Sequence, residues 1–437
     1  MQTVDLLIEP RWLIPVEPAG ATLRDHAVAV DRGLILDVLP AGEARLRYAP
    51  RQRLELVDHV LLPGLVNLHT HAAMTLLRGY ADDMTLMDWL KTRVWPAEIR
   101  HASPQFVYDG TLLACAEMLR GGVTCFNDMY FYPEQAAAAA LAAGMRSVPG
   151  IIVIEFPTGY ASDAEDYLAK GLAARDALRD EPLVSFCLAP HAPYTVSDRS
   201  FERIGTLSEQ LDLPIHVHLH ETAHEIEQSL AEHGVRPIAR FARLGLLGPN
   251  LIAVHAVHVD DGEIAQLAQT GCFVAHCPTS NMKLASGVAP VAAMAARGVR
   301  VGLGTDGAAS NNRLDLFQEM RHAALLAKVA SGDATVLDVH QVLRMATLHG
   351  AMALGLERRI GSILPGKEAD LCAVDLSGIE TQPCYDPASQ LIYAAGRENV
   401  SHVWVRGALR VEAGKVLQIS NNSLTGAINL WRNKIES

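Results

Sequence analysis

The sequence predicts an α/β fold: a (β/α)8 TIM-like barrel with a small flanking β-sandwich domain built from both chain ends. Three observations predict it. Eight short apolar runs alternate with helical patterns through the middle of the chain, both ends carry short alternating strands, and 437 residues suffice for more than one domain. With 49% hydrophobic and 20% charged residues, the composition is that of an ordinary globular protein.

The N-terminal part of the chain predicts short strands rather than helices. Apolar and polar residues alternate there, and Asp31, Arg32 and Gly33 supply a turn between two of the segments. The expected strands cover residues 4–8, 27–30, 34–38 and 54–58.

The barrel is predicted over residues 63–360. Strands that alternate with helices form right-handed βαβ units and therefore a parallel sheet, and eight of them close into a barrel. The eight apolar runs are residues 65–71, 123–129, 147–154, 184–190, 215–220, 251–257, 272–278 and 299–306. The helices between them are expected at residues 105–120, 134–143, 163–178, 200–210, 260–269 and 291–297.

The strand pattern returns near the C-terminus, where Gly407 and Gly414 supply turns. Two further helices are expected before it, at residues 314–326 and 339–354, and the strands themselves at residues 370–375 and 400–406. We therefore expect residues 1–62 and 361–420 to form one composite β-sandwich domain. The polar tail, residues 421–437, has no assigned role.

Composition and charge exclude several classes of partner. A formal net charge of −12 argues against a nucleic-acid surface, which needs a basic stripe. No apolar run approaches the ~20 residues that span a bilayer, and the acidic N-terminus does not resemble a signal peptide. The seven cysteines form no Cys-x-x-Cys pair, which favours free thiols. We therefore expect a cytoplasmic protein without nucleic-acid or membrane partners.

Titratable side chains gather where the predicted strands end, and in this type of barrel the C-terminal strand ends form the active site. A single histidine there is more commonly a hydrogen-bonded structural residue than a ligand. Their joint occurrence at one rim predicts a metal site. The residues are His69 and His71 on strand one, His191 after strand four, His216, His218, His220 and Glu221 on strand five, His255 and His258 on strand six, His276 on strand seven and Asp306 on strand eight.

A rival motif lies in the same segment. His220, Glu221 and His224 match His-Glu-x-x-His, the signature of zinc proteases, whose mechanism needs both histidines one turn apart on a helix. Because residues 215–220 alternate with the period of a strand, we expect the helix to begin at Thr222 and to leave His220 outside it.

Taken together, the ordered motifs resemble the amidohydrolase superfamily over nearly the whole chain. The chain is most similar to the aminohydrolase branch, and within it to the 5′-methylthioadenosine/S-adenosylhomocysteine deaminases. The resemblance rests on the strand-one His-x-His, on His218 with Glu221, on His255, and on Thr305 with Asp306. The matching segments are PGLVNLHTH at residues 63–71, HCPTSNMK at residues 276–283 and GSILPGKEADL at residues 361–371.

The resemblance implies one divalent metal ion, usually zinc, held by His69, His71, His218 and Asp306. Strand geometry alone leaves two other strand-five histidines as competitors, and only the family's His-x-x-Glu spacing selects His218. Related enzymes with two metals use a carboxylated lysine on strand four. Residues 184–190 contain no lysine, so one metal is expected.

The implied reaction is the hydrolytic deamination of an adenine nucleoside to the inosine analogue and ammonia. Catalytic roles fall to Glu221, His255 and Asp306: Glu221 carries a proton from water to the ring nitrogen, His255 orients the water or stabilises its charge, and Asp306 accepts the second proton. Glu221 and Asp306 also contact the substrate.

The substrate pocket rests on further resemblances. Glu98 matches the ribose-binding glutamate and His191 a substrate-contacting histidine, while Trp89 with Leu90 could form a wall. Residues 155–163 lack the arginine that suits the carboxylate of S-adenosylhomocysteine, and Arg146 lies at the wrong end of its strand. We therefore expect adenosine and 5′-methylthioadenosine to be better substrates.

Three alternatives stay open from the sequence. The first is a guanine, cytosine or triazine deaminase that uses the same ligands, although Glu98 would then have no ribose to bind. The second is the zinc metalloprotease, and the third is a metal-free binding barrel. The relatives often form homo-oligomers, so a homo-oligomer is a further expectation.

Overall fold

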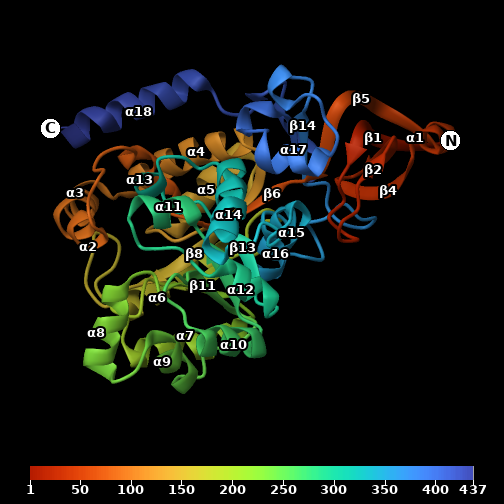
Figure 1. The fold of residues 1–437 in the computed structure, drawn as a ribbon. Helices are drawn as coiled ribbons and strands as arrows, with labels where there is room; N and C mark the ends of the chain where they lie inside the picture. Colours follow the sequence, from red (N-terminus) through yellow and green to blue (C-terminus); the bar gives the residue numbers. More distant parts are fainter. Residues whose placement is uncertain (437) are drawn as a thin grey trace.

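The computed structural model describes residues 1–436, and it contains two sheets (Figure 1). The first is a parallel eight-stranded sheet in sequence order, so the predicted barrel and all eight of its strands are confirmed. Its strands are β6 (Leu65–Thr70), β7 (Val123–Asp128), β8 (Arg146–Val153), β9 (Cys187–Pro190), β10 (Ile215–Leu219), β11 (Leu251–His255), β12 (Phe273–His276) and β13 (Arg300–Leu303).

Helices surround this sheet in the expected places. The predicted helices are found as α4 (Pro104–Arg120), α5 (Pro133–Ala143), α6 (Ala164–Leu178), α7 (Asp198–Leu211), α10 (Asp261–Thr270), α12 (Val291–Ala296) and α14 (Leu316–Ser331). Side-chain caps fix several of the starts. For example, Ser103 accepts a hydrogen bond from the Phe106 amide at 3.3 Å, and Asp260 forms a capping box with Glu263.

Except for α8, whose start at Thr222 was expected, the remaining helices were not predicted individually, and most of them are short. They are α1 (Ala41–Arg47), η1 (Ala72–Leu77), α2 (Leu86–Trp89), η2 (Leu90–Val94), α3 (Trp95–His101), α8 (Ala223–His233), α9 (Pro237–Arg243), α11 (Pro278–Lys283), α13 (Ala308–Asn311), η3 (Ile379–Thr381), α17 (Pro387–Tyr393), η4 (Arg397–Asn399) and α18 (Asn421–Glu436). None of the described helices is both long and apolar enough to cross a bilayer.

The single helix expected over residues 339–354 is wrong. The structure has two helices there, α15 (Val339–Met345) and α16 (Leu348–Ala353). The carbonyl of Ala346 accepts a hydrogen bond from the Val66 amide of β6 at 2.8 Å, and the Thr347 hydroxyl donates to the Leu343 carbonyl at 2.6 Å. These bonds compete with the helical pattern, so the helix is interrupted where it packs against the barrel.

Strands from both chain ends form the second sheet, which confirms the composite β domain. Figure 1 shows β14 beside the N-terminal strands, and β14 pairs directly with β5. The sheet curves around one core, so that Val28 and Trp404 belong to the same apolar cluster. Its strands are β1 (Gln2–Leu13), β2 (Leu23–Arg24), β3 (His26–Asp31), β4 (Leu34–Pro40), β5 (Tyr48–Pro63), β14 (Leu371–Asp375), β15 (Val400–Val405), β16 (Ala408–Glu412) and β17 (Lys415–Val416). The exact domain boundaries stay predictions.

The polar C-terminal tail forms helix α18, which lies across α4 (Figure 1). Trp431 is only 4% exposed, its ring packs edge-on against Phe106 at 5.1 Å, and its indole N–H donates to Asp109 at 2.8 Å. One buried aromatic residue therefore anchors a helix that the polar composition of the tail did not reveal.

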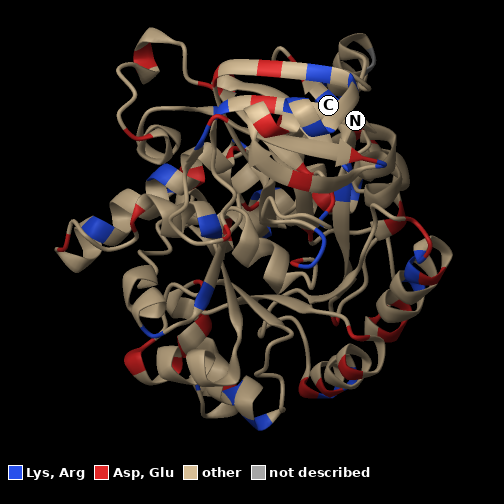
Figure 2. Ribbon diagram, turned by 90° about the vertical axis from the view of Figure 1, so that its right-hand side faces the viewer, with Lys and Arg blue, Asp and Glu red and all other residues tan. Residues whose placement is uncertain are grey.

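Acidic and basic residues are interspersed on the outer helices and strands (Figure 2).

A buried ion-pair network joins the barrel to the composite domain. Arg146, at the start of β8, contacts Glu368 at 2.5 Å and Asp370 at 3.2 Å, and it is almost fully buried. Arg359 also pairs with Glu368 at 2.8 Å, and the amide of Arg406 donates to Asp370 at 2.8 Å. Arg146 is therefore a structural residue at the barrel's N-terminal face, as its position in the sequence predicted.

Replacing Arg146 by methionine should lower the free energy of unfolding by about 3–5 kcal/mol, because the substitution leaves Glu368 and Asp370 buried without their partner. Urea denaturation followed by circular dichroism measures the change. Arg179→Met removes an exposed ion pair with Asp180 and should leave stability nearly unchanged. Equal losses in the two variants would contradict the structural role of Arg146.

Candidate metal centre and active site

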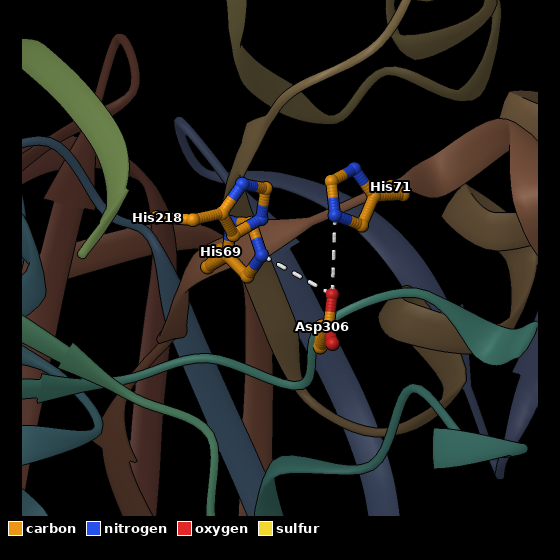
Figure 3. A group of neighbouring side chains, drawn as sticks. All are labelled: His69, His71, His218 and Asp306. Atoms are coloured by element: carbon orange, nitrogen blue, oxygen red, sulfur yellow. Dashed lines mark hydrogen bonds and ion pairs between the residues drawn. The ribbon is translucent and has the colours of Figure 1, made fainter. Parts of the chain in front are cut away.

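Four side chains from distant parts of the chain meet at the C-terminal rim of the barrel (Figure 3). They are His69 and His71 from the end of β6, His218 from β10 and Asp306 from the segment after β13. One potential ligand atom from each lies within 4.8 Å of the others. These four residues are the ligands predicted from the sequence, and the structure brings all of them together.

Hydrogen bonds orient the histidines so that their Nε2 atoms face one another. The Nδ1–H of His71 donates to the Met129 carbonyl at 2.6 Å, and that of His218 donates to the His191 carbonyl at 2.7 Å. A carbonyl can only accept, so it fixes the proton on Nδ1 and leaves the Nε2 lone pair free for a metal ion.

Asp306 is held in place from several sides. Its Oδ2 accepts hydrogen bonds from Ser280 at 2.6 Å and Ser310 at 2.7 Å, while its Oδ1 lies 3.2 Å from Nε2 of both His69 and His71. Burial alone would raise the pKa of Asp306, but the two imidazoles outweigh it and lower the pKa well below its usual range. The carboxylate is therefore ionised.

The donor set fits a divalent metal ion. Burial favours a neutral His69, whose pKa falls to about 4, whereas the pairing of His71 with Asp306 outweighs burial and raises the pKa of His71 to about 9. The cluster thus stabilises one positive charge beside the carboxylate, where a cation would sit. Three imidazoles and one carboxylate are a donor set that zinc prefers. In the described chain, β9 offers no lysine for a second metal.

Glu221 and His255 lie beside these four residues. His255 Nε2 is 3.9 Å from Glu221 Oε2, and the Nδ1–H of His255 donates to Asn281 at 2.8 Å. Both side chains are buried, and burial raises the pKa of Glu221 above its usual value, an effect that His255 partly offsets. The structure therefore places a carboxyl group and an imidazole next to the metal cluster.

A cavity opens directly above the cluster and reaches the other predicted residues. Glu98, His191 and Trp89 all line it. Burial raises the pKa of Glu98 to about 7. The walls of the cavity are mainly apolar. None of the described residues that line the cavity is lysine or arginine. The apolar and aromatic lining residues include Trp89, Leu90, Val94, Trp95, Met129, Phe131, Ile152, Ile154, Phe156 and Tyr160.

Two further residues, at and just after the end of β7, contribute to the site and were not predicted from the sequence. Asp128 accepts hydrogen bonds from the Thr70 hydroxyl at 2.9 Å and the Ala72 amide at 2.7 Å, so it fixes the turn that carries His71. Tyr130 lines the cavity with its buried hydroxyl. A signal existed, because the run at residues 123–129 carries an acidic residue, Asp128, next to its end, much as the run at residues 299–306 ends in Asp306.

The protease motif does not assemble a site. The Nδ1–H of His220 donates to the His258 carbonyl at 3.1 Å, and its Nε2 accepts from the Ile238 amide at 3.0 Å, so both nitrogens are occupied. Helix α8 begins after the cap residue Thr222, as expected, and His224 is exposed on it. His220 is therefore an internal anchor rather than a zinc ligand.

A barrel that gathers three histidines and an aspartate at its strand ends defines a metal-dependent hydrolase. Residues 60–410 match the model of the amidohydrolase family, and the chain belongs to this family, as the sequence motifs predicted. A 5-methylthioadenosine/S-adenosylhomocysteine deaminase of Teredinibacter turnerae is 45% identical over 99% of this chain and 98% of its own length.

Solved structures agree with this assignment. An adenosine deaminase from Xanthomonas campestris with bound zinc is 50% identical, with a TM-score of 0.98, over 100% of this chain and 99% of its own. An atrazine chlorohydrolase from Arthrobacter aurescens has a TM-score of 0.89 but is only 22% identical, over 98% of this chain and 99% of its own. The second similarity shows the fold alone.

Replacing Asp306 or His71 by alanine should reduce the bound metal from one ion per chain to a small fraction of that, because a four-ligand site loses its anion or one of its imidazoles. Elemental analysis after gel filtration measures the content. His224→Ala should retain the full ion. Loss of metal from the His224 variant alone would instead support the protease motif.

Proposed function

We propose that this protein is a zinc-dependent aminohydrolase that deaminates adenine nucleosides, releasing ammonia and the inosine analogue. The proposal rests on a single cavity with His71, His218, Asp306 and Glu221 at its floor and Glu98 on its wall, where His69 completes the metal cluster. The metal cluster and Glu221 would thus face one part of a bound substrate, while the carboxyl group of Glu98 would face another part. The deaminase names of the relatives support the same reaction.

The chemistry begins with attack of water on C6 of the purine. When bound, a divalent ion lowers the pKa of a coordinated water and so supplies a nucleophile at neutral pH. Glu221 takes a proton from the water and delivers it to the ring nitrogen N1 as the C6–O bond forms. His255, close to Glu221, stabilises the developing charge on the attacking oxygen.

The second half of the reaction removes the amine. Asp306 accepts the remaining proton of the attacking oxygen and passes it to the exocyclic nitrogen. The C6–N bond then breaks, ammonia leaves, and the C6 carbonyl of the product forms. The hydroxyl groups of Ser280 and Ser310 hold Asp306 for this transfer through its Oδ2 atom.

The wall of the cavity recognises the nucleoside. Glu98 accepts hydrogen bonds from both ribose hydroxyls, which a free base such as guanine or cytosine could not supply. His191 is held by the Thr195 hydroxyl at 3.0 Å and contacts the substrate from the opposite side. Trp89 packs against the substrate.

Because all seven cysteines are free thiols, we also propose that the enzyme works in the reducing cytoplasm.

Uncharged nucleosides should be preferred. Comparing kcat/KM by ammonia release, we expect adenosine and 5′-methylthioadenosine to exceed S-adenosylhomocysteine by about tenfold or more. The homocysteine carboxylate would enter an apolar cavity that offers it neither lysine nor arginine, and an unpaired charge is costly to bury. A clear preference for S-adenosylhomocysteine would refute this part of the proposal.

Replacing Glu221 by glutamine should lower kcat by about 100-fold or more while the metal content stays at one ion per chain, because the amide cannot shuttle a proton. Stopped assays of ammonia together with elemental analysis give both quantities. Glu227→Gln is a control on the same helix α8 that changes an exposed carboxyl outside the lining of the cavity. Substantial turnover by the Glu221 variant would remove this residue from the proton-transfer role.

A further inference from the structure

His216 and His218 point to the same side of β10, and His220 follows directly after the strand. Roles for His218 and His220 are already clear, whereas His216 has none so far. His218 belongs to the metal cluster, and His220 anchors the neighbouring segments through both of its nitrogens. His216 lies deeper in the barrel and is fully buried. It belongs neither to the ligand set nor to the lining of the cavity.

His216 contacts one ligand directly. Its Nε2 atom lies 2.9 Å from Nδ1 of His69, and the two ring centroids are 4.9 Å apart. Its own Nδ1 is buried and has no hydrogen-bond partner among the described residues. A buried imidazole is costly unless it is hydrogen-bonded, so the contact with His69 is the interaction that compensates for its burial.

The other two histidine ligands show what this contact does. Nδ1 of His71 and Nδ1 of His218 each meet a backbone carbonyl, which compels that nitrogen to carry the proton. His69 has no such carbonyl and meets an imidazole instead. An imidazole can accept or donate, so the tautomer of His69 is coupled to that of His216.

We propose that His216 is a positioning residue that holds His69 in its metal-binding tautomer. When Nε2 of His216 accepts, the proton of His69 stays on Nδ1 and the Nε2 lone pair of His69 faces the ion. The opposite arrangement would place a proton on Nε2 of His69, in the coordination position. This inference rests on the proposed metal function. It means that His216, which is not itself a ligand, also determines the affinity for the metal.

The test is the zinc affinity of His216 variants, measured by competition with a chromophoric chelator. His216→Phe keeps the ring but removes the acceptor, and its Kd for zinc should rise about 10–100-fold, as when the outer partner of a metal-bound histidine is lost. His216→Gln can present its amide oxygen near the position of Nε2 and should stay within a few-fold of the unmodified protein.

A matched control separates orientation from packing. His276 is also buried on a barrel strand, and its Nδ1 has no hydrogen-bond partner among the described residues, the metal ligands included. His276→Phe should therefore leave the zinc Kd unchanged. If His216→Phe does not fold, His216→Asn, whose side chain is too short to reach Nδ1 of His69, should show the same loss of affinity.

The outcomes are distinct. Unchanged zinc affinity in His216→Phe or His216→Asn overturns the inference, and so does an equal loss in His216→Phe and His276→Phe. Failure of the unmodified protein to bind zinc or to release ammonia from adenosine would refute the proposed function itself. If the unmodified enzyme is active with zinc bound while His216→Phe and His216→Asn bind zinc as tightly as it does, only the positioning role is refuted.

Discussion

The site depends on the closure of the barrel between its first and last strands. The amides of Thr305 and Asp306 donate to the His69 carbonyl at 3.2 and 3.0 Å. The side chain of Asn67 donates to the Thr305 hydroxyl at 2.8 Å and accepts from the Thr305 backbone amide at 3.0 Å. This seam joins the first and last metal ligands in the chain. A side chain at Gly304 would meet His69 and Cys277 at 2.8–3.0 Å, so the close approach of the strands requires glycine there. Metal binding is therefore a consequence of completing the fold.

The residues at the rim are held in backbone conformations that cost energy. His255 and Asp306 have positive φ angles of 71° and 61°, in a region that side chains other than glycine rarely adopt. Asn281, Ser280 and Ser310 hold their side chains through hydrogen bonds and so maintain these conformations. Strain at these two positions aims the imidazole of His255 and the metal ligand Asp306 at the same point, which is the arrangement that a preorganised active site needs.

Much of the fold could be predicted because each barrel strand is a short apolar run, and most of these runs end in or beside a polar group. Local pattern could not predict features that depend on tertiary partners: the break near Thr347, where β6 captures a helical carbonyl, and the C-terminal helix that Trp431 anchors. The same limit applies to β10. Alternation places His216, His218 and His220 on one side, but their different roles follow from the depth of each along the barrel and from the neighbour that each one meets.

We conclude that three imidazoles and one carboxylate hold one metal ion at the seam of the barrel. X-ray absorption at the zinc edge of the purified protein tests it most directly. We predict one zinc per chain, with nitrogen and oxygen ligands at about 2.0–2.2 Å and an imidazole scattering pattern. A sulfur shell at about 2.3 Å, or a second metal near the first, would contradict the claim.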